Sequence, residues 1–112
     1  MRSKLLFICS RNQWRSPTAE ALFKGSQTYE VRSAGISDTS RVRVNQGHIG
    51  WADAIFVMEN RHRQLIEQRF GAILRTKMIT VLDIPDDYAF MDDDLIAILR
   101  ERLAPHLTDW ET

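Results

Sequence analysis

Four short segments of the chain have the composition of strands, and three of them are almost entirely apolar. Continuous apolar runs of this length are typical of strands in a parallel sheet that is covered on both faces. The segment around Tyr29 and Val31 is more polar and is ended by Ala34 and Gly35. The predicted strands are residues 4–8, 29–33, 54–58 and 77–82.

Three segments between and after these runs carry helix signals, namely residues 16–23, 60–70 and 92–107. The first begins with Ser16 at the N-cap position and Pro17 at the first helical position, a common helix start. The last repeats leucine every four residues on one face, at Leu95, Leu99, Leu103 and Leu107. Residues 36–52 are polar and weakly patterned, and no element is predicted there.

Strands that alternate with helices predict an α/β fold, in which a four-stranded parallel sheet lies between two layers of helices. The chain has no repeat, low-complexity tract or linker, so we expect one domain over residues 1–112. Ligands of open α/β sheets bind beyond the carboxyl ends of the strands. The candidate site therefore lies in the loops that follow Ile8, Ser33, Met58 and Leu82.

The charge of the chain is balanced overall but uneven along its length. Fifteen Lys and Arg against fifteen Asp and Glu give a net charge of zero, which argues against nucleic acid or anionic lipid as the main partner. Residues 1–80 carry +7 and residues 81–112 carry −7. The apolar run 5–8 is too short for a signal-peptide core or a membrane span, so we expect a cytoplasmic location and no membrane partner.

Cys9 is the single cysteine, which excludes an intramolecular disulfide and a multi-cysteine zinc site. His48, His62 and His106 are not at metal-ligand spacing with one another or with Cys9, and none is assigned a catalytic role. We therefore predict a protein without a metal centre.

The segment from Cys9 to Ser16 has the pattern of an anion-binding loop between a strand and a helix. Backbone N–H groups of such a loop point inward, and the helix N-terminus adds a positive partial charge. Arg15 would hold two oxygens with its planar fork, and Ser16 would donate a hydrogen bond to the sulfur. This surrounding favours the thiolate of Cys9, which is the nucleophilic form. The residues predicted to bind phosphoryl oxygens, besides Arg15, are Arg11, Asn12, Gln13, Trp14 and Ser16.

Residues 9–21, which read C-x5-R-S-P-T-A-E-A, resemble the signature of the low-molecular-weight protein tyrosine phosphatases. Asn12 stands where that family has the asparagine that holds the loop. Further similar segments are residues 33–35, residues 52–59 with His62 and Leu65, and residues 84–86. The resemblance implies a phosphocysteine mechanism, with Cys9 as nucleophile, Arg15 as phosphate clamp and Asp86 as general acid and base.

The chain departs from the family pattern at several points. Arg11 replaces a small residue and makes the rim of the loop bulkier and more positive. Trp14 replaces the second cysteine that many members use to protect the nucleophile. Glu59 stands at an aspartate position, and the linker after residues 33–35 is shorter than usual, which removes part of the pocket wall.

The sequence leaves alternatives for the general acid and for the aromatic wall of the pocket. Asp87 competes with Asp86 as the acid, because a slip of one residue would exchange them. The resemblance places Tyr88 as an aromatic wall for a substrate ring. We expect Trp14 to fill core space and Phe90 to pack under its loop.

The sequence thus predicts a metal-independent phosphatase of phosphotyrosine proteins or aryl phosphates, acting as a monomer or weak dimer. No cofactor is needed, because the loop amides and a guanidinium supply the charge that magnesium supplies elsewhere. One alternative is a phospho-ligand binding module with weak or no turnover. A less favoured alternative is an arsenate reductase that depends on an external thiol, since the chain has one cysteine.

Overall fold

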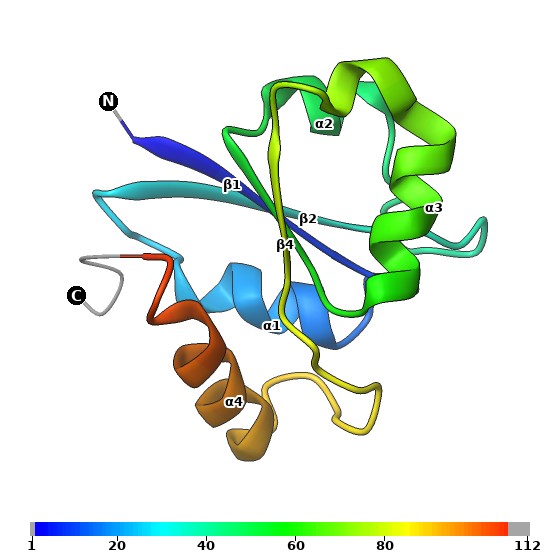
Figure 1. Cartoon of the computed structure of the whole chain (residues 1–112). Helices are drawn as coiled ribbons and strands as arrows, with labels where there is room; N and C mark the ends of the chain where they lie inside the picture. The colour runs from blue at the N-terminus through cyan, green and yellow to red at the C-terminus, as the bar shows by residue number, and fades with distance from the viewer. Residues whose placement is uncertain (1, 108–112) are drawn as a thin grey trace.

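A four-stranded parallel sheet forms the centre of the computed structural model, which describes residues 2–107 (Figure 1). Its order is β2-β1-β3-β4, so β1 lies inside the sheet and β2 is an edge strand. The strands are β1 (Ser3–Cys9), β2 (Tyr29–Gly35), β3 (Ala54–Val57) and β4 (Met78–Val81). Each falls on a strand expected from the apolar runs, and the predicted four-stranded α/β architecture is confirmed.

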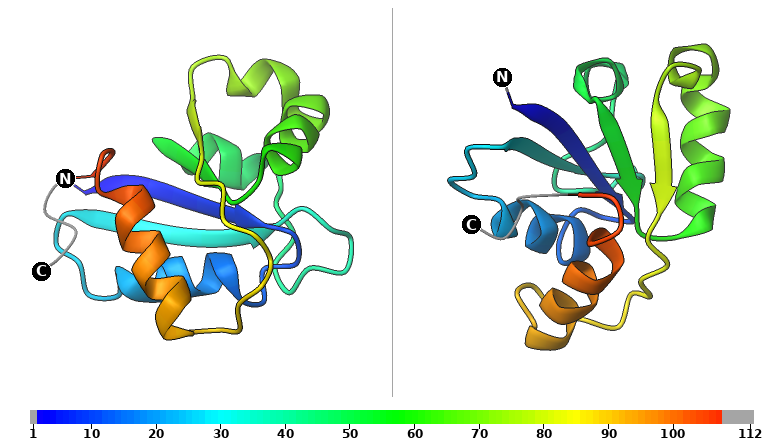
Figure 2. Two further views of the ribbon diagram at one scale, coloured as in Figure 1. Left: turned by 60° about the horizontal axis from the view of Figure 1, so that its bottom comes forward. Right: turned by 60° about the vertical axis from the view of Figure 1, so that its left-hand side comes forward.

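Helices cover both faces of the sheet (Figures 1 and 2). One face carries α1 (Arg15–Leu22) and α4 (Asp93–Leu103). The other carries α2 (Gln46–Trp51), α3 (Asn60–Phe70) and the short 3₁₀ helix η1 (Gly71–Leu74). Because side chains alternate along a strand, β1 supplies both layers. Leu5 and Phe7 lie in the α1–α4 core, and Leu6 and Ile8 lie in the α2–α3 core.

The leucine stripe of the last helix is confirmed as core packing. Leu95, Leu99 and Leu103 are completely buried on the sheet in α4. The helix ends at Leu103 rather than at residue 107, and Leu107 is still buried beyond its end.

The start of α1 differs from the expectation. The helix begins at Arg15 with Trp14 as its N-cap, and Ser16 is already inside the first turn. The Ser16 hydroxyl does not cap the helix, because it lies 2.9 Å from the sulfur of Cys9. The prediction of Ser16 as N-cap and Pro17 as first helical residue is therefore wrong, and the Ser16 hydroxyl contacts the sulfur of the loop instead.

One helix was not anticipated in the weakly patterned stretch of residues 36–52. Asn45 begins α2 by accepting the His48 N–H on its side-chain oxygen, and His48 Nδ1 accepts the Asn45 N–H in return. This reciprocal cap resembles the capping box, with asparagine and histidine in place of the usual pair. The apolar periodicity of six residues is too short to reveal such a helix from sequence.

Two aromatic residues lie where they were not expected. The Trp14 residue is 45% exposed and does not fill core space, because it stands at the end of the loop that enters α1. Phe90 is 52% exposed and does not pack under its loop. Both expectations are wrong because each side chain lies on a loop segment that runs along the surface.

The loops that follow β1 and β3 leave the sheet in different directions, because the sheet order reverses next to β1. The chain leaves β1 toward β2 on one side, and β3 lies on the other side. Loops that diverge in this way leave a crevice at the carboxyl ends of the strands.

Within residues 2–107 we find no helix long and apolar enough to cross a membrane. The same residues contain no group of three His, Cys, Asp or Glu side chains arranged to hold a metal ion.

Candidate active site

The loop after β1 is held in shape by a buried asparagine. Asn12 has a φ of 56°, in the left-handed region that asparagine tolerates better than most residues. Its side-chain amide donates to Ser16 Oγ at 2.9 Å and to Ser33 Oγ at 2.8 Å. One buried side chain thereby ties the loop to both α1 and β2.

Cys9 ends β1 at the base of this loop, and its sulfur receives two hydrogen bonds. The Asn12 N–H donates to Sγ at 3.2 Å, and Ser16 Oγ lies 2.9 Å from it. Ser16 Oγ accepts from the Asn12 amide, so its own hydrogen can point at the sulfur or at the Ala34 carbonyl, which lies 3.4 Å away. Ser33 accepts from the same Asn12 amide and donates to Glu20, so Asn12 donates both toward Cys9 and toward Glu20. Hydrogen bonds donated to sulfur stabilise a thiolate.

Arg15 is almost completely buried and uses one end of its guanidinium for structure. Its Nη1 donates to Glu59 Oε2 at 2.6 Å and to the Ile84 carbonyl at 2.7 Å. The other edge faces the pocket, with Nη2 3.2 Å from Ser10 Oγ and Nε 3.6 Å from Asp86 Oδ1. A guanidinium oriented by one end presents a fixed fork with the other.

Glu59 is the carboxylate that orients Arg15. Burial acts to raise the pKa of Glu59, but hydrogen bonds and charge from Arg15 and Arg61 outweigh it and hold that pKa below its ordinary value. The side chain is therefore ionised at neutral pH. The family aspartate position is filled here by a longer carboxylate that reaches two arginines at once.

These groups surround a pocket of about 400 Å³ whose wall comes from all four strand ends. The loop after β1 contributes most of the wall, β2 is followed by Ile36 and Ser37, β3 by Arg61, and β4 by Asp86. The site residues predicted from sequence that line it are Cys9, Arg11, Gln13, Trp14, Arg15 and Asp86. The candidate loops chosen from the strand pattern therefore meet in one crevice.

The remaining predicted residues lie elsewhere. Asn12 and Ser16 are buried behind the pocket, where they hold the loop and the sulfur. Asp87 and Tyr88, both among the described residues, do not line it. Tyr88 packs against the buried cluster between the sheet and α4.

Sequence reasoning missed Ser10 and Arg61 and assigned His62 only a supporting position. His62 is fully buried at the start of α3, where its Nδ1 accepts the Glu59 N–H at 3.1 Å and its Nε2 lies 3.0 Å from Ser10 Oγ. Burial, followed by the charges of Arg15 and Arg61, lowers the pKa of His62 to about 4. The available signal was a glutamate three residues before a histidine at a helix start, directly after a buried strand.

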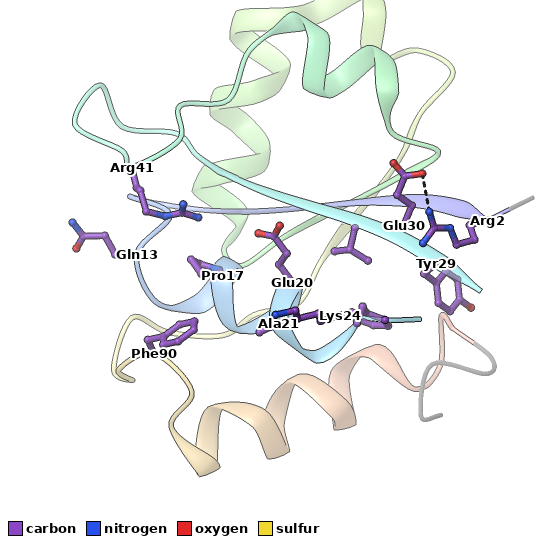
Figure 3. Close-up of a pocket in the computed structure, with 13 residues that line it drawn as sticks. Arg2, Gln13, Pro17, Glu20, Ala21, Lys24, Tyr29, Glu30, Arg41 and Phe90 are labelled. Carbon is purple, nitrogen blue, oxygen red and sulfur yellow. Dashed lines mark ion pairs between the residues drawn. The ribbon is translucent and has the colours of Figure 1, made fainter. Parts of the chain in front are cut away.

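A larger hollow, of about 710 Å³, lies between α1 and the edge strand β2 (Figure 3). Gln13 and Arg41 stand at one end of it, and Arg2 and Tyr29 at the other (Figure 3). Arg2 pairs with Glu30 at 3.7 Å at the end where Tyr29 lies (Figure 3). Gln13 also lines the Cys9 pocket, so the two hollows share a wall.

Comparison with known proteins finds one family. Residues 4–50 match the model of the low molecular weight phosphotyrosine protein phosphatases. A protein-arginine-phosphatase of Bacillus subtilis is 30% identical, with 69% of each chain covered. The protein-tyrosine-phosphatase PtpB of Staphylococcus aureus is 29% identical, over 61% of this chain and 65% of that protein. The chain thus spans about two thirds of the length of such relatives.

Solved structures agree on the fold. The YwlE arginine phosphatase from Geobacillus stearothermophilus has a TM-score of 0.67 at 23% identity, with 95% of this chain and 98% of that chain covered. The tyrosine phosphatase SP-PTP from Streptococcus pyogenes has a TM-score of 0.74 at 16% identity, with 95% and 94% covered. Together with the sequence matches, these likenesses show that the chain belongs to the low molecular weight phosphotyrosine protein phosphatase family.

Proposed function

We propose that this chain hydrolyses phosphorylated side chains of proteins through a phosphocysteine intermediate, without a metal ion. The observation that carries the proposal is the meeting of Cys9, the Nε–Nη2 edge of Arg15 and the Asp86 carboxyl in one pocket. These are a nucleophile, a planar phosphate clamp and a proton donor, which suffice for covalent phosphoryl transfer.

In the first step, the Cys9 thiolate attacks phosphorus while the bond to the leaving oxygen breaks. Asp86 gives its proton to that oxygen, so the alcohol leaves neutral and Asp86 becomes a carboxylate. Arg15 and the backbone N–H groups of the loop hold the three equatorial oxygens, whose charge grows in the transition state. Asp86 is 3.6 Å from Arg15 Nε, next to the place that the phosphoryl group would occupy.

In the second step, water attacks the phosphocysteine and the S–P bond breaks. The Asp86 carboxylate takes a proton from the water, which restores its acid form, and phosphate and the Cys9 thiolate are released. The hydrogen bond from Ser16 stabilises the departing thiolate, because its oxygen is 2.9 Å from the sulfur.

Among protein substrates we infer phosphotyrosine. Relatives are named for phosphotyrosine or phosphoarginine, so the family alone leaves both open. Among residues 2–107, the pocket wall carries Arg11, Arg15 and Arg61 and one acidic residue, Asp86. A phosphoarginine brings a second positive charge close to these guanidinium groups, whereas a phenol leaving group is neutral. The charge of the wall therefore favours an aryl phosphate.

The test is phosphate release from p-nitrophenyl phosphate, a phosphotyrosine peptide and a phosphoarginine peptide, with chelator present. We expect native protein to turn over the first two, Cys9→Ser to be inactive, and the phosphoarginine peptide to react at least about tenfold more slowly. Phosphate binding without release would favour the binding-module alternative. Arsenate reduction that requires added thiol would favour the reductase.

A further inference from the structure

Ser10 stands at the Cys9 pocket with an unusual set of partners. Its Oγ lies 2.6 Å from Arg61 Nη2, 3.2 Å from Arg15 Nη2 and 3.0 Å from His62 Nε2. Guanidinium nitrogens always donate, and His62 must also donate from Nε2, because its Nδ1 accepts the Glu59 N–H. Three donors thus surround a hydroxyl oxygen that has two lone pairs, and none of the three can accept the Ser10 hydrogen, which is left for a group that enters the pocket.

Arg61 is held rigidly at the rim of the pocket with part of its fork unused. Its Nε donates to Glu59 Oε1 at 3.2 Å, and its Nη2 donates to Ser10. In residues 2–107 no acceptor is found for its Nη1. A guanidinium that is already oriented loses little further entropy when it binds an anion.

Arg11 adds a second unused guanidinium on the same rim. Its side chain is exposed, lines the pocket and forms no hydrogen bond or ion pair with the part of the chain that the structure describes. The charges of Arg15 and Arg61 are already partly balanced by Glu59. A phosphoryl group on Arg15 would therefore leave Arg11 and the free end of Arg61 without an anionic partner.

We propose that Arg11, Arg61 and the Ser10 hydroxyl form a second anion-binding subsite, which takes the carboxylate of an acidic residue next to the phosphorylated residue. The planar fork of arginine matches a carboxylate, and Ser10 can donate a further hydrogen bond to it. This inference rests on the proposed function, because the phosphoryl group must occupy the Arg15 side of the same pocket. The inferred substrates are therefore protein segments in which an acidic residue lies next to the phosphotyrosine.

The experiment compares three phosphotyrosine peptides of equal length whose flanking residues are alanine, glutamate or lysine. Native protein should hydrolyse the glutamate peptide with a kcat/KM about tenfold above the alanine peptide, mostly through a lower KM. The lysine peptide should be the poorest substrate. At high salt the preference should shrink, since the subsite is open to solvent.

Amino-acid substitutions test which residues cause the preference for the glutamate peptide. The double variant Arg11→Gln/Arg61→Gln should bring the glutamate-to-alanine ratio to within about twofold. Arg61→Lys should keep part of the preference, because it retains charge without the fork. The matched control is Arg63→Gln, since Arg63 lies on the same helix but pairs with Glu67 at 3.6 Å and does not line the pocket. Its ratio should equal that of native protein.

Binding to Cys9→Ser protein separates this inference from the proposed function. Tighter binding of the glutamate peptide than of the alanine peptide supports the subsite even if no variant releases phosphate. Equal binding and equal turnover of the two peptides would overturn the subsite, while Cys9-dependent hydrolysis of p-nitrophenyl phosphate would leave the function standing. A preference for a doubly phosphorylated peptide over the glutamate peptide would overturn the carboxylate assignment.

Discussion

The groove between α1 and β2 and the Cys9 pocket differ in where the charged groups of their walls are directed. The groove between α1 and β2 is the larger, about 710 Å³ against about 400 Å³ for the Cys9 pocket. In the groove, Arg2 pairs with Glu30, and Glu20 accepts the Ser33 hydroxyl. The Cys9 pocket instead directs the pocket-facing edge of Arg15 toward its interior.

This comparison shows that the volume of a hollow does not indicate where the reactive side chains of this fold lie. The groove runs along α1 and the edge strand β2, and the described residues that reach it from other segments, such as Arg2, Arg41 and Phe90, include no cysteine and no carboxylate. The Cys9 pocket collects segments that follow all four parallel strands. Groups that must act together are brought together at that edge, because the carboxyl ends of parallel strands meet there.

The largest expected effect is a loss of kcat that a substitution in the Cys9 pocket causes and a substitution in the groove does not. Cys9→Ser should lower kcat on p-nitrophenyl phosphate at least about 10⁴-fold, because the hydroxyl is a far weaker nucleophile. Lys24→Gln, in the groove, should leave kcat within about twofold of native. Steady-state kinetics with both purified variants is the measurement. A strong loss in Lys24→Gln would show that the groove takes part in the reaction.

The next effect tests the acid. Asp86→Asn should lower kcat roughly 10²- to 10³-fold, and the neighbouring Asp87→Asn should change it less than about threefold. The loss should be smaller for p-nitrophenyl phosphate than for phenyl phosphate, because nitrophenolate leaves without a proton more easily. The reverse pattern in the two variants would move the role to Asp87.

The third effect is on stability and concerns the foundation of the Cys9 pocket. The pKa of His62 is lowered from 6.5 to about 4, mainly by burial. Between these values the unfolded chain binds a proton that the folded chain does not, so the free energy of unfolding falls as pH drops from 6.5 toward 4, by up to about 3 kcal/mol.

His62→Gln should remove this part of the pH dependence, since glutamine can accept from the Glu59 N–H and donate to Ser10 without titrating. Denaturant unfolding at pH 7 and pH 5 measures it. Glu59 and His48, whose pKa values are also lowered, leave a residual slope of the same sign. Equal slopes in native and variant protein would contradict the assignment.

A smaller effect tests a hydrogen-bonded link between the groove and the Cys9 pocket. Glu20 lines the groove and accepts from Ser33, whose oxygen accepts from the same Asn12 amide that donates to Ser16 beside Cys9. Glu20→Ala should lower kcat about fivefold to tenfold, because Ser33 loses its acceptor. Glu20→Gln should stay near native, since the amide oxygen still accepts. Similar losses in both variants would point to the charge of Glu20 rather than to the orientation of the Ser33 hydroxyl.

The smallest effect is expected for the exposed ion pair of the groove. Arg2→Gln should change the free energy of unfolding by less than about 0.5 kcal/mol, because Arg2 and Glu30 are both well exposed to solvent. Denaturant unfolding at low and high salt measures it. A change of several kcal/mol would mean that the groove is structurally coupled to the core.

Most of the fold could be predicted from local sequence pattern. Three apolar runs and the more polar segment around Val31 identified all four strands, and α3 was expected over the residues it occupies. The failures have local causes. Helix α2 is too short to show periodicity, and the Ser16 hydroxyl turns to Cys9 instead of capping α1. Propensity and spacing report on neighbours along the chain, so they miss a side chain whose partner is decided elsewhere.

By itself, the sequence determined the loop from Cys9 to Ser16, because the proposed nucleophile, the proposed clamp and the hydroxyl lie within eight consecutive residues. Only the tertiary structure decided that Glu59 holds Arg15, that Arg61 and Ser10 share the rim, and that Tyr88 turns to the core. The physical reason is long-range pairing. Parallel register brings the ends of β1, β3 and β4 together, and packing against α1 and α3 fixes which side chains point inward.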